Sequence, residues 1–231
     1  MITVRHSQDR GRANFGWLDS KHTFSFANYY DPQHMGFSEL RVINDDVVQP
    51  GAGFDTHDHR DMEIISYVIE GTIEHKDSEG NIQNLPAGEF QLMSAGKGVY
   101  HSEYNGSIDD QLRFLQIWIQ PNSFDGKPGY QQKNFGRQIG LTTIASPTGE
   151  DGTLLIKQDA KLHQLILDTQ SQLTFEIERG RRVYVHLVSG QLSLDSTELK
   201  PGDGAKVEEQ AQLFFKNTGT ELVTALIFEL P

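Results

Sequence analysis

Residues 56–71 read THDHRDMEIISYVIEG, and this stretch decides how the chain is interpreted. His57 and His59 lie one residue apart, ahead of Glu63 and an apolar run that ends at Gly71. A short apolar run closed by glycine is typical of a buried β-strand. Because side chains alternate between the faces of a strand, the two histidines point the same way, about 6 to 7 Å apart at Cα. Either they pack as ordinary polar residues, or they supply two nitrogen ligands to one ion.

Short apolar runs separated by turns continue through the whole chain. Turn signals such as Ser78-Glu79-Gly80-Asn81 and Asn105-Gly106 separate runs that are rich in Val, Ile, Phe and Tyr. No long apolar stripe with helical spacing is present, so the pattern predicts an all-β fold of barrel or sandwich type. In the first half, strands are expected at 40–48, 63–70, 72–75, 90–93, 99–104 and 113–120. In the second half, they are expected at 141–145, 153–157, 172–177, 183–188, 191–194, 204–207 and 222–229.

The two halves of the sequence look like distant copies. YVIEGTIEH at 67–75 is followed by LPAGEFQLM at 85–93, and HLVSGQLSL at 186–194 is followed by LKPGDGAKV at 199–207. Each unit is an apolar strand, a glycine, a second strand, a hairpin and a turn that joins glycine to an acidic residue. A repeat of domain length predicts a duplicated fold rather than a solenoid.

A polar stretch with proline and glycine, PNSFDGKPGYQQKNFG at 121–136, separates the two halves and is interpreted as a linker. The predicted organisation is therefore an N-terminal domain at 1–120, a linker at 121–136 and a C-terminal domain at 137–231. A chain of 231 residues is long enough for two such domains, each with its own core.

Composition excludes several classes of function. The absence of cysteine rules out disulfide frameworks, thiol catalysis and cysteine-ligated metal sites. A formal net charge of −12 presents a repulsive average field to polyanions, so direct nucleic-acid binding is not expected. No apolar stretch is long enough for a membrane span, and the N-terminus has no hydrophobic signal region. We therefore expect a cytoplasmic protein without membrane contact.

A second pair of possible ligands lies in GKGVYHSEYN at 96–105. His101 and Glu103 have the same parity and share one face of the expected strand. If this strand faces the one that carries His57 and His59, three nitrogens and one carboxylate can converge on a point, which suits a divalent first-row metal. The alternative is ordinary packing, but burying so many polar groups without a metal would require a hydrogen-bond partner for each. The pattern therefore favours a metal site.

Two spacings in this region resemble the cupin motifs. They are Gly51-x5-His57-x-His59-x3-Glu63 with Gly71 after it, and Gly98-x2-His101-x3-Asn105. The interval from Glu63 to Gly71 is one residue longer than the usual cupin spacing, and Gly96 stands where many cupins have proline.

A more specific resemblance covers about the N-terminal half of the chain. It rests on FGWLDS (15–20), HTFSFANYYDP (22–32), GFSELRVINDD (36–46), HDHRDME (57–63), EGTIEHKDSEGN (70–81) and SAGKGVYHSEYN (94–105). Together these segments resemble the pirin family, in particular the bacterial pirin-like proteins with quercetin 2,3-dioxygenase activity. The C-terminal half is similar only to a divergent second cupin. The resemblance implies a bicupin of two β-barrels with one metal in the N-terminal barrel.

The pirin resemblance also implies the ligand set, which is His57, His59, His101 and Glu103. In many single cupins the carboxylate ligand is instead the residue at the position of Glu63. Strand alternation alone does not decide whether Glu63 or Glu103 is the ligand. We take Glu103 as the ligand and Glu63 as a supporting residue that orients a histidine by a hydrogen bond.

The corresponding positions of the second barrel carry no such ligands. Aligning Gly190 with Gly71 places Glu176 and Glu178 at the histidine positions and Arg182 at the position of Glu63. No His-x-Glu pair follows, and His163 and His186 do not have the required spacing. We predict a degenerate C-terminal cupin without a metal.

The resemblance implies a dioxygenase that cleaves a flavonol-like aromatic substrate with O2 and releases CO, with Glu103 as the general base. Iron(II) is the expected ion by resemblance, with nickel, manganese, cobalt, copper and zinc as alternatives. A monomer is expected. The main alternative is a pirin-like regulatory protein that binds a metal and acts through protein–protein contacts without turnover. A further alternative is a structural barrel stabilised by the metal.

Other residues carry weaker signals. Three apolar residues are pocket candidates beside the metal, although core packing is the simpler interpretation: Phe37, Met93 and Phe114. Trp17 and Trp118 are expected in the core. His75, at the edge of a hairpin, is interpreted as a surface or turn-bonding histidine.

Overall fold

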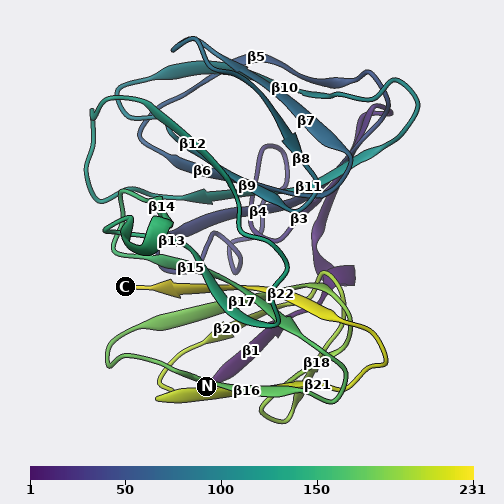
Figure 1. The fold of residues 1–231 in the computed structure, drawn as a ribbon, viewed down its shortest axis with the longest axis vertical. Helices are drawn as coiled ribbons and strands as arrows, with labels where there is room; N and C mark the ends of the chain where they lie inside the picture. The colour runs from purple at the N-terminus through teal and green to yellow at the C-terminus, as the bar shows by residue number, and fades with distance from the viewer. The chain divides into compact units, whose positions relative to one another are not determined.

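The computed structural model describes all of residues 1–231 and is built almost wholly of β-strands (Figure 1). It divides into two compact units, each with one seven-stranded and one four-stranded sheet. The unit formed by Gly11–Gly136 and Ile156–Gln158 is called the N-terminal barrel. The unit formed by Met1–Arg10, Arg137–Leu155 and Asp159–Pro231 is called the C-terminal barrel. The predicted all-β bicupin fold is confirmed. No helix has the length and hydrophobicity that a membrane crossing requires.

The N-terminal barrel holds the predicted site. Its larger sheet has the order β12 (Gly129–Asn134), β9 (Glu89–Ser94), β6 (Glu63–Glu70), β11 (Leu112–Ile119), β4 (Leu40–Val48), β3 (Leu18–His22) and β2 (Gly11–Asn14). Its smaller sheet has the order β5 (Gly53–His59), β10 (Val99–Asn105), β7 (Thr72–Asp77) and β8 (Ile82–Pro86).

The C-terminal barrel has the same two-sheet design. Its larger sheet has the order β1 (Ile2–Arg5), β20 (Gly204–Val207), β17 (Arg182–Ser189), β22 (Val223–Leu230), β15 (Lys161–Leu167), β13 (Gly140–Ser146) and β14 (Leu154–Leu155). Its smaller sheet has the order β16 (Gln172–Glu176), β21 (Gln212–Asn217), β18 (Leu192–Leu194) and β19 (Thr197–Leu199). Two short 3-10 turns, Ser7–Asp9 and Glu150–Gly152, complete the elements.

The compact units depart from the predicted boundaries at both ends of the linker and at the N-terminus. Strand β1 pairs with β20, so Met1–Arg10 belongs to the C-terminal barrel. Strand β12 lies inside the predicted linker and pairs with β9, because the unpaired edge of the larger sheet offers backbone partners. Ile156–Gln158 belongs to the N-terminal barrel, where Gln158 donates a hydrogen bond to the Gln120 carbonyl. Sequence pattern does not report which edge a short strand completes.

The internal repeat has matching structural anchors in the two barrels. Gly71 has φ +81° and lies so close to Leu112 that a Cβ atom would stand 3.1 Å from the Leu112 Cα. Gly190 has φ +86° and lies in the same way against Val223, at 2.9 Å. Both glycines therefore combine a left-handed backbone with a close backbone approach, which other residues tolerate poorly.

Two buried asparagines repeat as well. Asn105 donates through Nδ2 to the carbonyls of Val48, Gln49 and Asp110, and its Oδ1 accepts from Ser107 N. Asn217 donates through Nδ2 to the carbonyls of Leu167, Asp168 and Glu221, and its Oδ1 accepts from Gly219 N. The same amide closes the same corner of each barrel, so the two halves share one framework.

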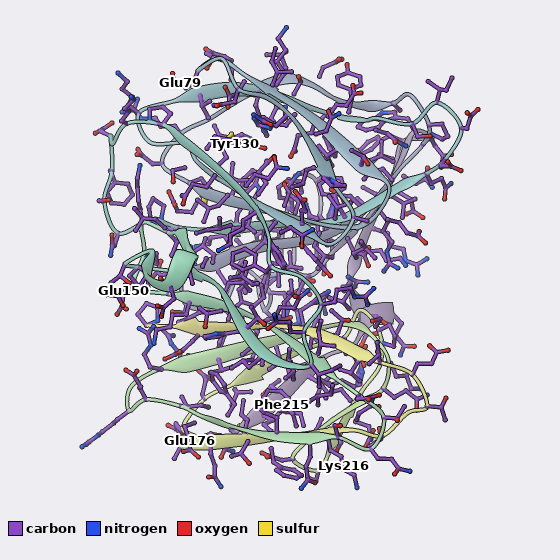
Figure 2. The ribbon with its side chains drawn as sticks, in the orientation of Figure 1. Glu79, Tyr130, Glu150, Glu176, Phe215 and Lys216 are labelled. Carbon is purple, nitrogen blue, oxygen red and sulfur yellow. The ribbon has the colours of Figure 1, made fainter.

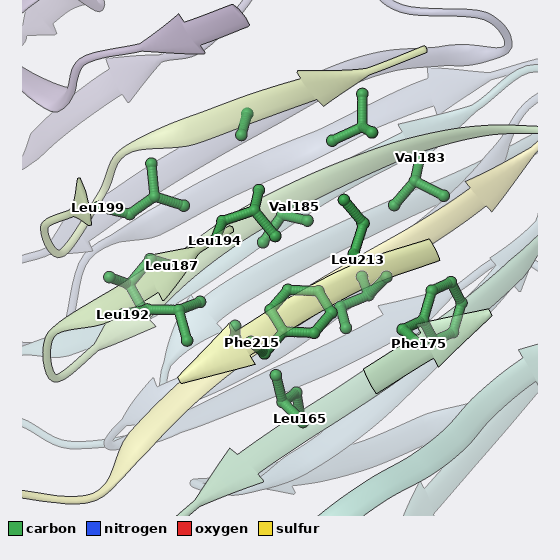
Figure 3. Close-up of a cluster of buried hydrophobic side chains, with 14 of the residues drawn as sticks. Leu165, Phe175, Val183, Val185, Leu187, Leu192, Leu194, Leu199, Leu213 and Phe215 are labelled. Carbon is green, nitrogen blue, oxygen red and sulfur yellow. The ribbon is translucent and has the colours of Figure 1, made fainter. Parts of the chain in front are cut away.

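The interiors of the two barrels differ. The C-terminal barrel is filled by one continuous apolar cluster to which both sheets contribute, including Val185, Leu194 and Phe215 (Figure 3). The N-terminal barrel has two smaller clusters, one around Phe114 and one around Met93. It also carries a row of polar residues across neighbouring strands of its larger sheet, here called the polar row: His22, Asn44, Gln116, Ser66 and Gln91.

Candidate metal centre

The predicted histidines come together because β5 and β10 are antiparallel neighbours. In their register His101 lies opposite His57, and Val99 lies opposite His59. Each of the three histidines has a ring nitrogen within 4.8 Å of a ring nitrogen of the other two. The structure therefore brings His57, His59 and His101 together, as the spacing predicted.

The two opposed histidines have the geometry of neighbouring ligands. The Nε2 atoms of His57 and His101 are 3.0 Å apart. Two nitrogens bound to one ion at about 2.1 Å, at right angles, would be separated by roughly 3 Å. The His57 Nδ1 atom lies 2.7 Å from the Asp55 carbonyl, which can only accept, so Nδ1 carries the proton. This bond leaves the His57 Nε2 atom unprotonated and orients it, as the outer partner of a metal ligand does.

The surroundings keep two of these imidazoles neutral. Burial, followed by repulsion from His101 and His57, lowers the pKa of His59 from 6.5 to about 4. Burial, followed by repulsion from His57 and His75, lowers the pKa of His101 to about 3. Both side chains are therefore uncharged near pH 7, and the neutral imidazole is the form that binds a metal.

Glu103 completes a second, overlapping cluster. Its ligand oxygen, a nitrogen of His101 and a nitrogen of His75 all lie within 4.8 Å of one another. The Glu103 Oε1 atom accepts a hydrogen bond from Ser66 Oγ at 3.1 Å, while Oε2 has no hydrogen-bond partner. Glu103 is 2% exposed, and a buried carboxylate oxygen without a donor is costly unless a cation lies nearby. Imidazole nitrogens and a carboxylate oxygen are ligand types that suit a divalent first-row metal, and His101 belongs to both clusters.

His75 is the residue that the sequence interpretation placed wrongly at the surface. It is 1% exposed, and its Nε2 atom lies 3.1 Å from Asp77 Oδ2. Asp77 in turn accepts from the backbone N–H groups of Glu79 and Asn81, so the turn-bonding part of the interpretation has a structural basis. The His75 ring also lies tilted against the ring of Tyr130, which is labelled in Figure 2, with 4.7 Å between the ring centroids. The sequence did contain a signal for the burial of His75, because this residue lies two positions after the buried Ile73 and therefore on the same face of the strand.

Glu63 lies apart from both clusters. Its Oε2 atom accepts from Ser94 Oγ at 2.9 Å and from the Lys157 backbone N–H at 3.1 Å. Burial is the main cause of its raised pKa. Since Glu63 lies opposite Ser94 in the β6–β9 register, its carboxylate joins these strands. The expected hydrogen bond from a histidine is not present.

A cavity of about 670 Å³ opens beside the histidines. It is lined by His57 and His59 together with Trp17, Phe26, Phe54, Gln116, Trp118 and neighbouring residues of β5 and β10. The three pocket candidates from the sequence do not line it, because Met93 and Phe114 pack in the two apolar clusters and Phe37 is buried elsewhere. Trp17 and Trp118, which were expected in the core, are half-buried walls of this cavity.

The equivalent region of the C-terminal barrel carries different chemistry. Glu176, labelled in Figure 2, and Glu178 are exposed. The guanidinium of Arg182 donates to the Pro231 carbonyl. Buried His163 bonds Thr143 through Nδ1 and lies 3.6 Å from Glu229, which also pairs with Arg181 and Lys161. The Glu229 carboxylate is thus paired with the basic side chains of Arg181 and Lys161. Both clusters of possible metal ligands lie in the N-terminal barrel.

The chain is similar to known proteins over its full length. Residues 3–119 match the Pirin family model, and residues 143–230 match the model of the quercetinase C-terminal cupin domain. The chain is 47% identical to quercetin 2,3-dioxygenase of Escherichia coli K12, covering 100% of this chain and 99% of that protein. It is 39% identical to a putative quercetin 2,3-dioxygenase of Pseudomonas aeruginosa, covering 100% of both.

Solved structures give the same picture. The bacterial pirin YhhW from Escherichia coli, in complex with nickel(II), is similar with a TM-score of 0.96 and 46% identity, covering 100% of this chain and 99% of that one. A quercetin 2,3-dioxygenase from Acinetobacter baumannii shares the fold with a TM-score of 0.78 at 19% identity, covering 98% and 85%. On this evidence, and with the histidine cluster in its N-terminal barrel, the chain belongs to the pirin family.

Proposed function

We propose that this chain is a metal-dependent quercetin 2,3-dioxygenase, which opens the central ring of a flavonol with O2 and releases CO. The observation that carries the proposal is the convergence of His57, His59 and His101, together with a Glu103 oxygen that has no partner, beside an aromatic cavity. The full-length similarity to proteins of this activity supports the same conclusion.

The ligands we propose are His57, His59, His101 and Glu103. A bound ion supplies a Lewis acid and, if it is redox-active, a partner for O2. The hydrogen bond from His57 Nδ1 to Asp55 orients one ligand, and the bond from Ser66 to Glu103 Oε1 orients another. We propose iron(II) as the native ion. Nickel(II), which the similar YhhW structure holds, is the first alternative, ahead of manganese, cobalt, copper and zinc.

The proton of the flavonol 3-hydroxyl group goes to Glu103 in this proposal. Oε2 accepts no hydrogen bond from the protein, so this oxygen would bind the ion in the absence of substrate and would accept the proton once the flavonol is bound, while Ser66 holds Oε1 in place. The aromatic side chains of the cavity keep water from the deprotonated substrate. Both oxygen atoms of O2 enter the products, and the carbon between the two new carboxyl-derived groups leaves as CO.

The proposal is tested by loading metal-free protein with iron(II) or nickel(II) and measuring O2 uptake and CO release with quercetin. We expect turnover with a loaded metal and its loss in His57→Ala, with elemental analysis to count the bound metal. Fully loaded protein that takes up no O2 with quercetin would contradict the proposal. Capture of a specific protein partner by the same loaded sample would then favour the regulatory alternative.

A further inference from the structure

A second cavity adjoins the one beside the histidines. Its volume is about 480 Å³, within the range of small-molecule sites. The two cavities share four lining residues, Trp17, Phe26, Phe54 and Gln116. The second cavity is lined by residues of the segment from Arg12 to Tyr29, which includes β3, and by Asn44 and Asp46 of β4. The two cavities together are called the slot.

Aromatic side chains line both cavities of the slot, among polar and aliphatic residues. Trp118 lies edge-on against His59 at 5.0 Å and against Phe26 at 5.4 Å. Trp17 lies edge-on against Phe54 at 5.2 Å. Aromatic rings that line a cavity offer apolar contact area to a planar aromatic ligand.

The floor of the second cavity is polar. Asn44, Asp46 and Gln116 lie on the neighbouring strands β4 and β11, and they are 2%, 2% and 7% exposed. Asp46 accepts a hydrogen bond from Ser20 through Oδ1. The Asn44 Oδ1 atom is buried and has no hydrogen-bond partner, and the Gln116 amide lies on the adjacent strand. Because buried polar groups are nearly always paired, the unpaired Asn44 Oδ1 atom beside the polar side chains of Asp46 and Gln116 points to a ligand with hydroxyl groups.

We propose that the slot holds the pendant ring of a flavonol and that Asn44, Asp46 and Gln116 recognise the hydroxyl groups of this ring. The substrate class is therefore flavonols that are hydroxylated on the pendant ring. This inference rests on the proposed function, since the oxygens at the other end of the ligand are taken to lie at the metal centre. Burial raises the pKa of Asp46 to about 7, so its carboxyl group can donate to a phenol or accept from one.

The chain carries its own reporters for the test. Its two tryptophans are Trp17 and Trp118, and both line the slot, so tryptophan fluorescence reports ligand there directly. Metal-loaded protein is titrated without O2, once with quercetin, which has two hydroxyls on the pendant ring, and once with galangin, which has none. We expect quercetin to bind at least about tenfold more tightly, the equivalent of one or two good hydrogen bonds.

Substitutions on the floor identify the groups responsible. In Gln116→Leu and Asp46→Asn, we expect quercetin to lose most of this tenfold advantage while the affinity for galangin changes little. Gln111→Leu is the matched control, since Gln111 is exposed, precedes the same strand and lies outside both cavities. Bound metal and thermal unfolding are measured for each variant. If Gln116→Leu does not fold, Asp46→Asn, which keeps the shape of the side chain, supplies the test.

Equal affinity of the wild type for the two flavonols, or equal losses for both in the floor variants, would overturn the inference. Turnover is scored separately, so the two proposals can fail independently. A preference for quercetin that the floor variants abolish, without CO release, would retain the slot and reject the dioxygenase. CO release from both flavonols, together with equal affinities for the two, would retain the dioxygenase and reject the slot.

Discussion

The two barrels share a framework and differ in what fills it. Gly71 and Gly190 hold the same close turn, so counting from them places Val185 where Ser66 lies and Leu194 where His75 lies. Counting from Leu112 and Val223, the residues that these glycines contact, places Ile227 where Gln116 lies. The strand registers agree, since Gln116 pairs with Ser66 and Ile227 pairs with Val185.

The difference shows which residues the fold requires and which the site requires. Each polar residue of the N-terminal interior in this comparison has an aliphatic counterpart in the C-terminal cluster (Figure 3). The barrel therefore folds around an apolar core, and the polar interior is an addition that lowers the apolar burial available for stability. Such groups are tolerated where they hold a ligand, which is why departures from a consistent core mark functional sites.

Removing the nitrogen that both clusters share should have the largest effect on the polar interior. In His101→Ala we expect metal affinity to fall by more than roughly 100-fold, since even the outer partners of metal ligands are worth 10- to 100-fold. Elemental analysis after dialysis at defined free metal measures the loss. His163→Ala, which removes the buried histidine of the C-terminal barrel, is the control and should leave the metal content unchanged. Retention of wild-type metal in His101→Ala would contradict the assignment.

Opening a hole in the apolar interior should affect stability without affecting the metal. Phe215 is fully buried in the C-terminal cluster, so Phe215→Ala should lower the free energy of unfolding by about 3 to 5 kcal/mol. Phe214, its exposed neighbour on β21, provides the control, and Phe214→Ala should cost less than about 1 kcal/mol. Urea denaturation followed by circular dichroism measures both. If Phe215→Ala lowered the metal affinity as well as the free energy of unfolding, the apolar interior of the C-terminal barrel and the polar interior of the N-terminal barrel would not be independent.

Acid should destabilise the metal-free N-terminal barrel through its histidines. The folded pKa values of about 4 for His59 and about 3 for His101 lie below the ordinary value of 6.5. The unfolded chain therefore binds more protons in this range. The contribution of the two histidines to the free energy of unfolding is complete above pH 6.5 and is lost as the pH falls through about 4 for His59 and about 3 for His101. Urea unfolding followed by tryptophan fluorescence reports this barrel, since Trp17 and Trp118 both lie in it.

Asp46 opposes this trend and supplies the check. Its pKa is raised from 3.8 to about 7, chiefly by burial, so its contribution to stability grows as the pH falls through that range. Asp46→Asn removes the opposing effect and should make the loss of stability with acid steeper. A flat profile between pH 6.5 and 4 in this variant would show that the histidines are not held neutral by the fold.

Exchanging equivalent residues between the barrels should produce the smallest and most specific effects. Ser66→Val removes the donor to Glu103, and we expect metal affinity to fall by about tenfold. The reciprocal Val185→Ser places an unpaired hydroxyl in the apolar cluster and should lower the free energy of unfolding by about 2 kcal/mol. It should leave the metal affinity as it was. Isothermal titration with metal and urea denaturation distinguish the two outcomes.

The sequence by itself determined the all-β class, the duplicated bicupin and the pairing of His57 and His59 with His101. These follow from local patterns, since alternation assigns each strand residue to a face and glycine with a positive φ marks the turns. Ligation by these residues and by Glu103 stays a prediction, which His101→Ala and Ser66→Val address.

Only the tertiary structure decided which other side chains meet at the site. It placed buried His75 beside Glu103, bound the Glu63 carboxylate to Ser94 and Lys157 by hydrogen bonds, and paired β1 with β20. It also made Trp17 and Trp118 the walls of a cavity, where they pack at the edge of the core clusters. The physical reason is that the alternation of side chains assigns each residue to one face of its strand, but does not say which residues of other strands contact it there. Those meetings depend on strand register and sheet curvature, which arise from contacts between residues far apart in the sequence.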